Sequence, residues 1–583
     1  MNKFRHMEEF FRANKWRYML GVFVLLFVDG LQLVTPKLLG HITDSLGSHT
    51  LSMKQIYFYV FLIILIAVFI AVFRYIWRML IIGASRDLEF WLRNKLFSHL
   101  EKLSINYFHH KKTGDLMAHA TNDINAVRMA FGMGVVMATD AIFLTLSTIM
   151  IMMVSVDMKF TLVALIPLPF VALTVTFFGK VIQRKFKRVQ EAFSNLTDKA
   201  QESFSGIRVI KSFVQEDKEI NNFADANKNN LDENMNLIKI WGAMFPLVIF
   251  MASLSFVITL YYGGVLVIDK TISLGQFVTF ISYLGLLTWP MMAVGYVINV
   301  LQRGTASILR INEILDTEPE IFDDENTLEL DDFEEAIEFK NLSFTYPGAE
   351  IPALRDINIT LEKGRTLAII GKTGSGKTTL ANLILRLYNV EKGKLLLGGY
   401  DINQMPFHLL RSKIGYVPQD NFLFSCTIKE NIAFADESLP FEKVEEAAKI
   451  TSVYDDIMDF PQKFETQLGE RGITLSGGQK QRISIARAIA KNPGIMIFDD
   501  CLSAVDTKTE EKILKNLKKV TKDRTSIIIA HRISTVKDAD EIIVLDEGRI
   551  IERGNHDYLV SIKGYYSSIY HKQLLEEKIA GEE

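Results

Sequence analysis

The sequence has little cysteine and little net charge. Only Cys426 and Cys501 occur among 583 residues, which argues against a disulfide framework and a cysteine-rich metal site, so we interpret both as ordinary thiols. The formal net charge of −3 argues against a nucleic-acid-binding protein, because such proteins carry a basic excess. Much of the first half also lacks charge over long apolar stretches, whereas the second half alternates charges with short apolar runs. We therefore predict a membrane domain over 1–325 and a second domain over 326–583.

Six apolar stretches are long enough to cross a bilayer, since a hydrocarbon core of ~30 Å needs about 20 helical residues. The two long connections between them are rich in Lys and Arg, and so is the amino terminus. Basic flanks stay in the cytoplasm, so both termini and both long connections should face inward. We expect the long connections to be helical extensions, and "MEEFFRANKW" to be an amphipathic helix on the membrane surface. The expected spans are 17–38, 55–73, 137–156, 160–179, 240–268 and 273–301.

Two acidic residues fall within these spans. Asp29 lies ~20 Å beyond the interfacial Trp16 along a helix, near the middle of the bilayer or slightly past it. An unpaired charge at this depth is costly, so its side chain should face protein, water or a cation. Asp140 is nearer the cytoplasmic end of its span, where exposure to water would explain it. Both are candidate substrate-binding residues, with helix packing and hydration as the alternatives.

A phosphate-binding loop follows the strand-like run "TLAII" in the second domain. The sequence "GKTGSGKTTLANLIL" fits the pattern G-x-x-x-x-G-K-[ST] and continues into a helix, whose positive end favours phosphate. Glycines let backbone N–H groups approach phosphate oxygens, Lys377 supplies a charge, and the Thr378 hydroxyl can bind Mg²⁺. The expected nucleotide-binding residues are Gly371, Gly374, Ser375, Gly376, Lys377, Thr378 and Thr379.

Candidate catalytic residues follow three further strand-like runs. The apolar run 495–498 ends at Asp499, the expected second Mg²⁺ partner, and at Asp500, whose carboxylate suits a general base. Gln419 of "YVPQD" could reach metal and water, and His531 of "TSIIIAHRIS" could contact a terminal phosphate. Alone, these two would be read as a loop amide and a strand-end histidine. Their order along the chain favours the catalytic interpretation.

A second anion-binding helix start occurs in the same domain. The stretch "LSGGQKQR" opens a helix with a hydroxyl and two glycines. One nucleotide is not expected to be gripped by two such helix starts within one compact fold, so the second start should serve a nucleotide held by another subunit. Its expected nucleotide-binding residues are Ser476, Gly477, Gly478 and Gln479.

In this combination the motifs resemble those of an ATP-binding cassette exporter of the half-transporter kind, over essentially the whole chain. The resemblance implies a six-helix, all-α transmembrane domain followed by an α/β ATPase domain, with ATP and Mg²⁺ as cofactors and membrane lipids as surroundings. It implies that Tyr346 of "FTYPG" stacks on adenine, although a strand tyrosine would otherwise be interpreted as packing. It also implies coupling helices near 113–118 and 206–213, a communication loop at 466–472 and an interface loop at 503–506.

One residue departs from the family pattern. The residue after the Mg²⁺-binding aspartate is normally a glutamate that polarises the attacking water, and here it is Asp500. In this respect the chain resembles the degenerate-site subunit of bacterial heterodimeric multidrug exporters. We therefore expect a partner half-transporter with a catalytic glutamate, a slow ATP site in this chain, and export of hydrophobic or cationic drug-like compounds across the bacterial cytoplasmic membrane.

Other functions are compatible with parts of this pattern. A homodimeric lipid or drug flippase would use the same motifs, and an ATP-gated channel or regulatory membrane protein would use the cassette as a switch. The channel hypothesis has little support, because no added regulatory segment interrupts the chain. The six expected spans exclude a soluble cassette ATPase. The absence of a protease domain before the first span disfavours a leader-cleaving peptide exporter.

Overall fold

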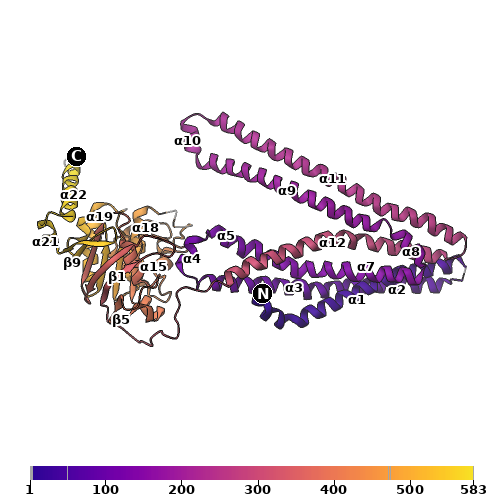
Figure 1. Ribbon diagram of the computed structural model, residues 1–583, viewed down its shortest axis with the longest axis horizontal. Helices are drawn as coiled ribbons and strands as arrows, with labels where there is room; N and C mark the ends of the chain where they lie inside the picture. Colours follow the sequence, from indigo (N-terminus) through magenta and orange to yellow (C-terminus); the bar gives the residue numbers. More distant parts are fainter. Residues whose placement is uncertain (1–3, 49, 470–471, 473–474, 504, 582–583) are drawn as a thin grey trace. The chain divides into compact units, whose positions relative to one another are not determined.

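The computed structural model describes residues 4–48, 50–469, 472, 475–503 and 505–581. The chain divides into two compact units (Figure 1). Each unit has its own clusters of buried apolar side chains. The membrane unit comprises Met1–Glu101 and Lys111–Glu318, and the nucleotide unit comprises Lys102–His110 and Pro319–Glu583. A short piece of the first long connection thus belongs to the nucleotide unit, and the boundary after residue 318 lies slightly before the one expected at 325.

The membrane unit contains six helical stretches that are long and apolar enough to cross a membrane (Figure 1). This confirms the predicted number of spans, and the basic connections continue the spans as helices, as expected. Helical hydrogen bonding within each stretch satisfies the backbone, which a lipid environment requires. The six stretches are Arg5–Gly47, Met53–Leu100, Thr113–Ser155, Met158–Ser205, Glu216–Ile268 and Leu274–Leu315.

Capping boxes start two of these stretches. The Ser52 hydroxyl accepts a hydrogen bond from the N–H of Gln55 at the start of α2 (Met53–Trp77), and the Gln55 side chain bonds back to the Ser52 N–H. Ser273 and Gln276 form the same pair at the start of α12 (Leu274–Leu315). Each box satisfies backbone donors that lack an intrahelical partner, so these sequences fix where the helices begin.

The expected separate amphipathic helix is instead the beginning of α1 (Glu8–Gly47), which runs continuously into the first span. Met7 and Phe10 are buried against Leu88 and Ile308, which lie on α3 (Gly83–Leu100) and α12. The prediction of a separate helix was wrong because no breaker divides this segment from the span, and its apolar side packs on neighbouring helices. Its place at the membrane surface stays a prediction.

The fourth stretch is divided at Pro167, which the sequence analysis included in a continuous span. Helix α8 (Met158–Leu165) ends there and α9 (Leu168–Ser205) begins. Proline has no backbone N–H and its ring crowds the preceding turn, so a break at this position follows from its chemistry. The other helical elements of this unit are η1 (Arg5–Met7), η2 (Arg78–Ile82), α5 (Thr113–Ala118), η3 (His119–Asp123), α6 (Ile124–Met129), η4 (Ala130–Gly134), α7 (Val135–Ser155), α10 (Ile207–Ser212) and α11 (Glu216–Ile268).

The nucleotide unit is built on two sheets. A four-stranded antiparallel sheet has the order β2-β1-β4-β5, and a six-stranded sheet has the order β10-β9-β3-β8-β7-β6, parallel except for the β9–β10 pair. All five residues of β7 are buried between two parallel neighbours, which confirms the predicted buried strand. The strands are β1 (Ile337–Phe344), β2 (Leu354–Leu361), β3 (Thr366–Gly371), β4 (Leu395–Leu397), β5 (Tyr400–Asp401), β6 (Ile414–Val417), β7 (Ile495–Asp499), β8 (Thr525–Ile529), β9 (Glu541–Asp546) and β10 (Arg549–Gly554).

Helices flank the larger sheet, and β6, β7, β8 and β3 bring their carboxyl ends to one edge. Ligands bind at this edge in open parallel sheets. The helices of the unit are α4 (Ile105–His110), α13 (Lys377–Ile384), η5 (Ile402–Gln404), α14 (Phe407–Ser412), α15 (Ile428–Ile432), α16 (Phe441–Ile450), α17 (Tyr454–Met458), η6 (Lys463–Glu465), α18 (Gly477–Ala490), α19 (Thr507–Thr521), α20 (Ile533–Val536), α21 (His556–Ser561) and α22 (Tyr565–Gly581).

Candidate nucleotide-binding site

The phosphate loop joins β3 to α13. Gly374 and Gly376 have φ values of 81° and 100°, a left-handed conformation that glycine adopts without strain. The Lys377 ammonium folds back over the loop and donates to the carbonyl oxygens of Gly371 at 2.9 Å and Lys372 at 2.8 Å. The loop is therefore wound around a buried cation, which is the arrangement that holds phosphate groups.

Lys377 and the two neighbouring aspartates, Asp499 and Asp500, influence one another's charge. Burial lowers the pKa of Lys377, while the carboxylates of Asp499 and Asp500 favour its charged form. Burial raises the pKa of Asp499, and a hydrogen bond from the Thr378 hydroxyl opposes that rise. The Asp499 carboxyl group is therefore a buried acceptor beside a hydroxyl oxygen.

Two buried oxygens of this site accept or donate no hydrogen bond in the described part of the chain, Asp499 Oδ2 and Ser375 Oγ. The unpartnered carboxylate oxygen of Asp499 and the neighbouring Thr378 hydroxyl are oxygen donors of the kind that Mg²⁺ prefers, and phosphate oxygens and water usually complete its shell. Asp499 and Thr378 thus fit the expected Mg²⁺ ligands. Among the described residues no group of three or more His, Cys, Asp and Glu side chains could hold a metal without such a ligand.

Gln419, Asp500 and His531 follow β6, β7 and β8, which are neighbours in the sheet, so all three lie near the same edge. Gln419 Nε2 lies 3.4 Å from Asp500 Oδ2, and His531 is close enough to influence Asp499 electrostatically. Asp500 has a left-handed φ of 47°, which aspartate tolerates better than most side chains, and its N–H donates to Ile529 O at 2.8 Å. The acid is therefore held beside the metal position by its backbone.

Helix α18 begins within "LSGGQKQR" and is called the signature helix below; two of the residues predicted to bind a nucleotide cap it. The Gln479 N–H donates to Ser476 Oγ at 3.2 Å, and the Ser476 N–H donates to Gln479 Oε1 at 3.0 Å. The Gln479 amide also donates to Asp456 Oδ1 at 3.1 Å. In the portion of the chain that the structure describes, neither Ser476 nor Gln479 hydrogen-bonds to the phosphate loop. This helix start is free to meet a ligand held elsewhere.

Tyr346 belongs to an aromatic cluster beside the phosphate loop. Its hydroxyl donates to Thr379 Oγ1 at 3.0 Å, and its ring lies nearly perpendicular to those of Phe344 and Tyr388. The hydroxyl of Tyr388 in turn lies 3.4 Å from Nδ1 of His109, on α4. The expected adenine-stacking tyrosine is thus fixed in orientation and is linked through Tyr388 to a segment from between the second and third spans.

The segment that packs within the nucleotide unit lies earlier than the expected coupling helix. The resemblance indicated 113–118, and Thr113–Ala118 is helix α5 of the membrane unit. It is α4 that belongs to the nucleotide unit, where Ser104 and Asn106 donate to the carboxylate of Glu320. The other expected segment contains α10, whose Val209 is 60% exposed. A coupling role for these segments stays a prediction.

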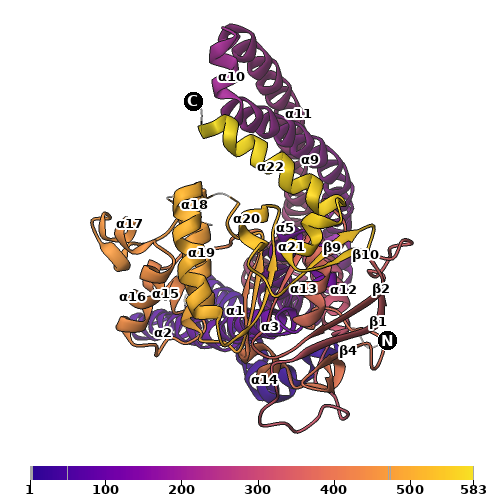
Figure 2. The same ribbon diagram turned by 90° about the vertical axis from the view of Figure 1, so that its left-hand side faces the viewer.

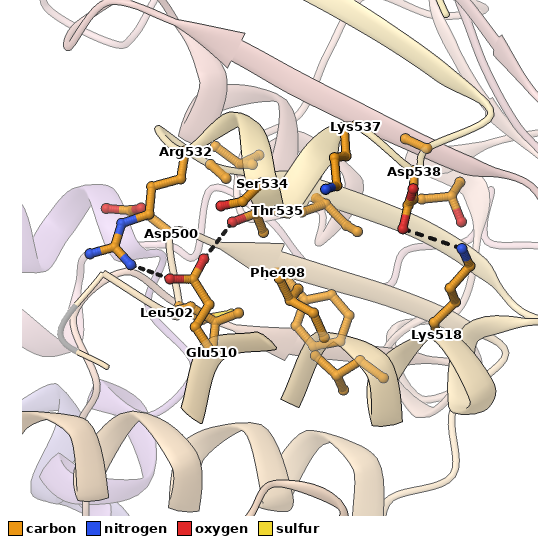
Figure 3. A pocket seen from close by; sticks show the side chains of 18 of the residues that line it. Phe498, Asp500, Leu502, Glu510, Lys518, Arg532, Ser534, Thr535, Lys537 and Asp538 are labelled. Carbon is orange, nitrogen blue, oxygen red and sulfur yellow. Dashed lines mark hydrogen bonds and ion pairs between the residues drawn. The ribbon is translucent and has the colours of Figure 1, made fainter. Parts of the chain in front are cut away.

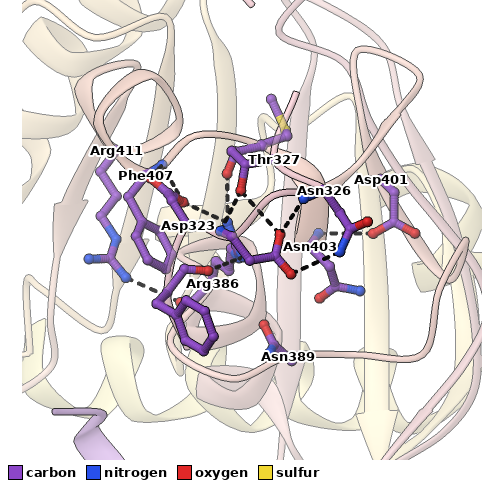
Figure 4. A network of polar contacts seen from close by, with 12 residues as sticks. Asp323, Asn326, Thr327, Arg386, Asn389, Asp401, Asn403, Phe407 and Arg411 are labelled. Carbon is purple, nitrogen blue, oxygen red and sulfur yellow. Dashed lines mark hydrogen bonds and ion pairs between the residues drawn. The ribbon is translucent and has the colours of Figure 1, made fainter. Parts of the chain in front are cut away.

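A polar network fastens the linker from the last membrane helix to the nucleotide unit (Figure 4). The Arg386 guanidinium is only 2% exposed and donates to Met405 O at 2.6 Å, Phe322 O at 3.2 Å and Asp323 Oδ1 at 3.3 Å. Arg386 and Arg411 both lie over the ring of Phe407. Because Arg386 follows α13 directly, the linker is anchored at the far end of the helix that begins at the phosphate loop.

A cavity of about 660 Å³ lies next to β7 and β8, between α19 and the loop after β8 (Figure 3). Asp500, His531 and Arg532 are among the residues that line it. The buried Glu510 accepts hydrogen bonds from the Arg532 guanidinium and, at 2.9 Å, from the Thr535 hydroxyl. Glu510 therefore ties the residues after His531 to α19.

The two acids predicted to meet substrate are brought together by the membrane unit. Asp29 on α1 is 2% exposed, and its carboxyl group lies within hydrogen-bonding reach of that of Asp140 on α7. Gln32 Nε2 donates to Asp29 Oδ1 at 3.3 Å. Asp29 Oδ2 and Asp140 Oδ1 receive no hydrogen bond from a donor group in the described ranges. This pairing could not be predicted from the sequence, because the two residues lie on different spans.

Two predicted loops lie partly outside the described residues. The expected communication loop includes 470–471, and the expected interface loop includes Ala504. Of the interface loop, Ser503 Oγ donates to Asp500 O at 3.2 Å, and Asp506 caps α19 by accepting from the Thr509 N–H at 3.0 Å.

Comparison with known proteins matches both units. Residues 18–291 match the family described as ABC transporter transmembrane region, and residues 354–503 match the family described as ABC transporter. The chain is 39% identical, over 97% of each chain, to the "Probable multidrug resistance ABC transporter ATP-binding/permease protein YheI" of Bacillus subtilis (strain 168). It is 37% identical to the "Multidrug resistance-like ATP-binding protein MdlA" of Escherichia coli (strain K12), over 99% of this chain and 97% of that protein.

This chain is also similar to a lipid flippase and to an exporter of known structure. An "ATP-dependent lipid A-core flippase" of Syntrophus aciditrophicus (strain SB) is 35% identical over 84% of this chain and 81% of that protein. The "Structure of a bacterial Atm1-family ABC exporter with ATP bound" superposes with a TM-score of 0.76 at 26% identity, covering 96% of this chain and 98% of that one. The order of six helices followed by an α/β nucleotide unit matches that exporter fold.

Proposed function

The chain belongs to the ATP-binding cassette transporters, a multi-pass membrane protein whose ATP hydrolysis is coupled to transport, and from this premise we propose that it is one subunit of a heterodimeric exporter. Its cargo is hydrophobic or cationic drug-like compounds, moved outward across the bacterial cytoplasmic membrane with both termini in the cytoplasm. The observation that carries the proposal is Asp500, a shortened base beside an otherwise intact phosphate loop and an intact signature helix.

At this chain's own site the residues can bind ATP but position water poorly. Backbone N–H groups of the loop and the Lys377 ammonium hold the phosphates, and Tyr346 stacks on adenine. Asp499 and Thr378 would hold Mg²⁺, which when bound neutralises charge on the terminal phosphates. Asp500 is one methylene shorter than glutamate, so its carboxylate is withdrawn by roughly an ångström from the attacking water, and a misplacement of this size can cost about 100-fold in rate.

The partner completes the second site. Ser476 and Gln479 cap α18 and, within the described ranges, make no hydrogen bond to the phosphate loop of the same chain, which agrees with their use on a nucleotide held by another subunit. We propose that the partner supplies a phosphate loop and a glutamate there, so that one site hydrolyses quickly and the other holds ATP. A homodimeric lipid or drug flippase is the second candidate, because lipid A-core flippases are among the similar proteins.

The cargo proposal rests on the paired carboxyl groups of Asp29 and Asp140. Two carboxyl groups within hydrogen-bonding reach share one proton more readily than they carry two charges. A cationic compound could replace that proton, and the charge it meets would be desolvated by the surrounding helices. This gives the pair a chemical preference for cations over neutral compounds of similar size.

Exchange of Asp29 for asparagine should weaken export of cations selectively. In inside-out vesicles that contain the complex, we expect Asp29→Asn to lower ATP-dependent uptake of a cationic dye by about tenfold, the equivalent of roughly 1.4 kcal/mol. Uptake of a neutral dye should change less than about twofold. Accumulation of either dye against its gradient also separates a pump from an ATP-gated channel.

Asp44→Asn is the matched control. Asp44 is on the same helix, and its carboxylate accepts from Ser273 Oγ and the Gly275 N–H, both at 2.6 Å. Its loss loosens helix packing and should affect both dyes alike. An equal effect of Asp29→Asn on both dyes would assign Asp29 to packing, and absence of ATP-dependent accumulation of any dye would refute the drug exporter.

A further inference from the structure

The carboxyl-terminal helix α22 is firmly attached where it begins. The Glu552 carboxylate, on β10, accepts hydrogen bonds from the N–H groups of Tyr565 and, at 3.0 Å, Tyr566. The Tyr566 side chain is fully buried, and its hydroxyl lies 2.8 Å from Nδ1 of His556. The start of α22 is therefore fixed relative to the edge of the large sheet.

Farther along α22, Gln573 contacts the main chain on both sides of Arg532. Its Nε2 donates to the carbonyl oxygen of His531 at 2.9 Å, and its Oε1 accepts from the Ile533 N–H at 2.8 Å. A side-chain amide carries a donor and an acceptor in one plane, so it can satisfy both backbone groups at once. A carboxylate or an alkyl side chain at this position could not.

Apolar contacts support the same attachment. Ile533 and Val536, from α20, are buried in one cluster with Tyr566, and Ile569 of α22 packs against that cluster. The cluster also contains Ile370 of β3, the strand that leads into the phosphate loop. Helix α22 lies beside α20 and α21 in this region (Figure 2). Helix α22 thus packs in the same apolar cluster as β3, which leads into the phosphate loop, and as α20, which follows the loop with His531.

The loop after β8 is held on its other side by α19. Glu510 binds the side chains of Arg532 and Thr535, as Figure 3 shows. The backbone of His531 is therefore clamped by Gln573, while the side chain of the next residue is clamped by Glu510. Two fixed points on adjacent residues hold the His531 backbone, and with it the point from which the imidazole projects.

We propose that Gln573 is a positioning residue, which holds the His531 backbone so that the imidazole reaches the terminal phosphate of ATP. The inference rests on the proposed phosphate contact of His531 and adds the group that makes this contact possible. The contribution is specific for ATP over ADP, because only ATP carries the terminal phosphate.

The test compares ATP and ADP binding by the purified full chain in the cold, where turnover is slow. We expect Gln573→Ala to weaken ATP binding by about tenfold and ADP binding by less than about twofold, as His531→Ala should. The double variant should bind ATP no more weakly than His531→Ala alone, because Gln573 acts through His531. Gln573→Glu, which keeps the length but cannot donate to the His531 carbonyl oxygen, should resemble Gln573→Ala.

Hydrogen exchange and a neighbouring variant complete the test. The Ile533 amide should exchange faster in Gln573→Ala, which removes its acceptor, and change less in Gln573→Glu, whose carboxylate can still accept from it. Lys572→Ala is the control, because Lys572 is exposed on the same helix and its ammonium lies 3.9 Å from the Glu576 carboxylate. It should leave ATP binding, ADP binding and Ile533 exchange unchanged.

Each contrary result has a distinct meaning. If Gln573→Ala keeps the preference for ATP while His531→Ala loses it, the inference is wrong and the role of His531 stands. If His531→Ala also keeps the preference, the proposed phosphate contact fails and the inference fails with it. Equal loss of ATP and ADP binding, or a double variant weaker than His531→Ala, would show that Gln573 only supports the fold.

Discussion

Ser476→Arg in this chain is expected to abolish most ATPase activity of the complex, whereas Asp500→Asn should leave more than about half of it. Ser476 caps α18 and, in the proposed arrangement, faces the nucleotide on the partner's phosphate loop. An arginine there would fill the space of the phosphates at the fast site. Asp500 belongs to the slow site, so its charge contributes little to total turnover.

The variant Ser476→Ala separates the effect of added side-chain volume from the effect of losing the helix cap. Ser476→Ala removes the hydrogen bond from the Gln479 N–H but adds no volume, and loss of a cap costs about 1 kcal/mol. We expect a moderate loss of ATPase activity from Ser476→Ala and a nearly complete one from Ser476→Arg. If Asp500→Asn instead eliminates all turnover, Asp500 is a competent base and the asymmetric assignment is wrong.

Lys377→Ala should remove most nucleotide binding at this chain's own phosphate loop. The Lys377 ammonium is 7% exposed and bonds to two loop carbonyl oxygens, so its loss removes the phosphate contact and also the group that shapes the loop. Hydrogen bonds to charged groups are worth about 1.5–3 kcal/mol, which corresponds to roughly 10- to 100-fold in ATP affinity. Equilibrium binding of a fluorescent ATP analogue to the purified chain measures the change.

The control for this variant is Lys363→Ala. Lys363 lies just before β3, and its ammonium pairs with the Glu335 carboxylate at 2.7 Å, away from the loop. We expect less than a threefold change in ATP affinity, about 0.6 kcal/mol. Unchanged affinity in Lys377→Ala would mean that this loop does not bind the nucleotide.

Features with a local signal could be predicted from the sequence. The six spans followed from uninterrupted apolar length, and the phosphate loop from glycine spacing between a strand and a helix. Buried strand β7 followed from its apolar run, and the positions of Gln419, Asp500 and His531 just after strands followed from the strand-like runs before them. In each case a few adjacent residues determine the outcome.

Features that depend on distant packing could not be predicted in the same way. The amino-terminal helix is apolar on one side, which suits a membrane surface or a neighbouring helix equally, and only the fold selects α3 and α12. The break at Pro167 has a local signal, the proline itself, although the apolar run continues on both sides of it. The roles of Arg386 and Gln573 had none, because each depends on backbone groups far away in the sequence.

The central claim is that this chain's own site is slow because Asp500 is too short, and single-turnover hydrolysis of ATP bound at that site tests it most directly. In a complex whose partner site is inactivated, Asp500→Glu should accelerate hydrolysis by about 100-fold, whereas Asp500→Gln, of equal length but without a base, should stay slow. Thermal unfolding would check that the left-handed backbone at this position accepts the longer side chains. No acceleration in a folded Asp500→Glu complex, or rapid hydrolysis by the unaltered site, would contradict the account.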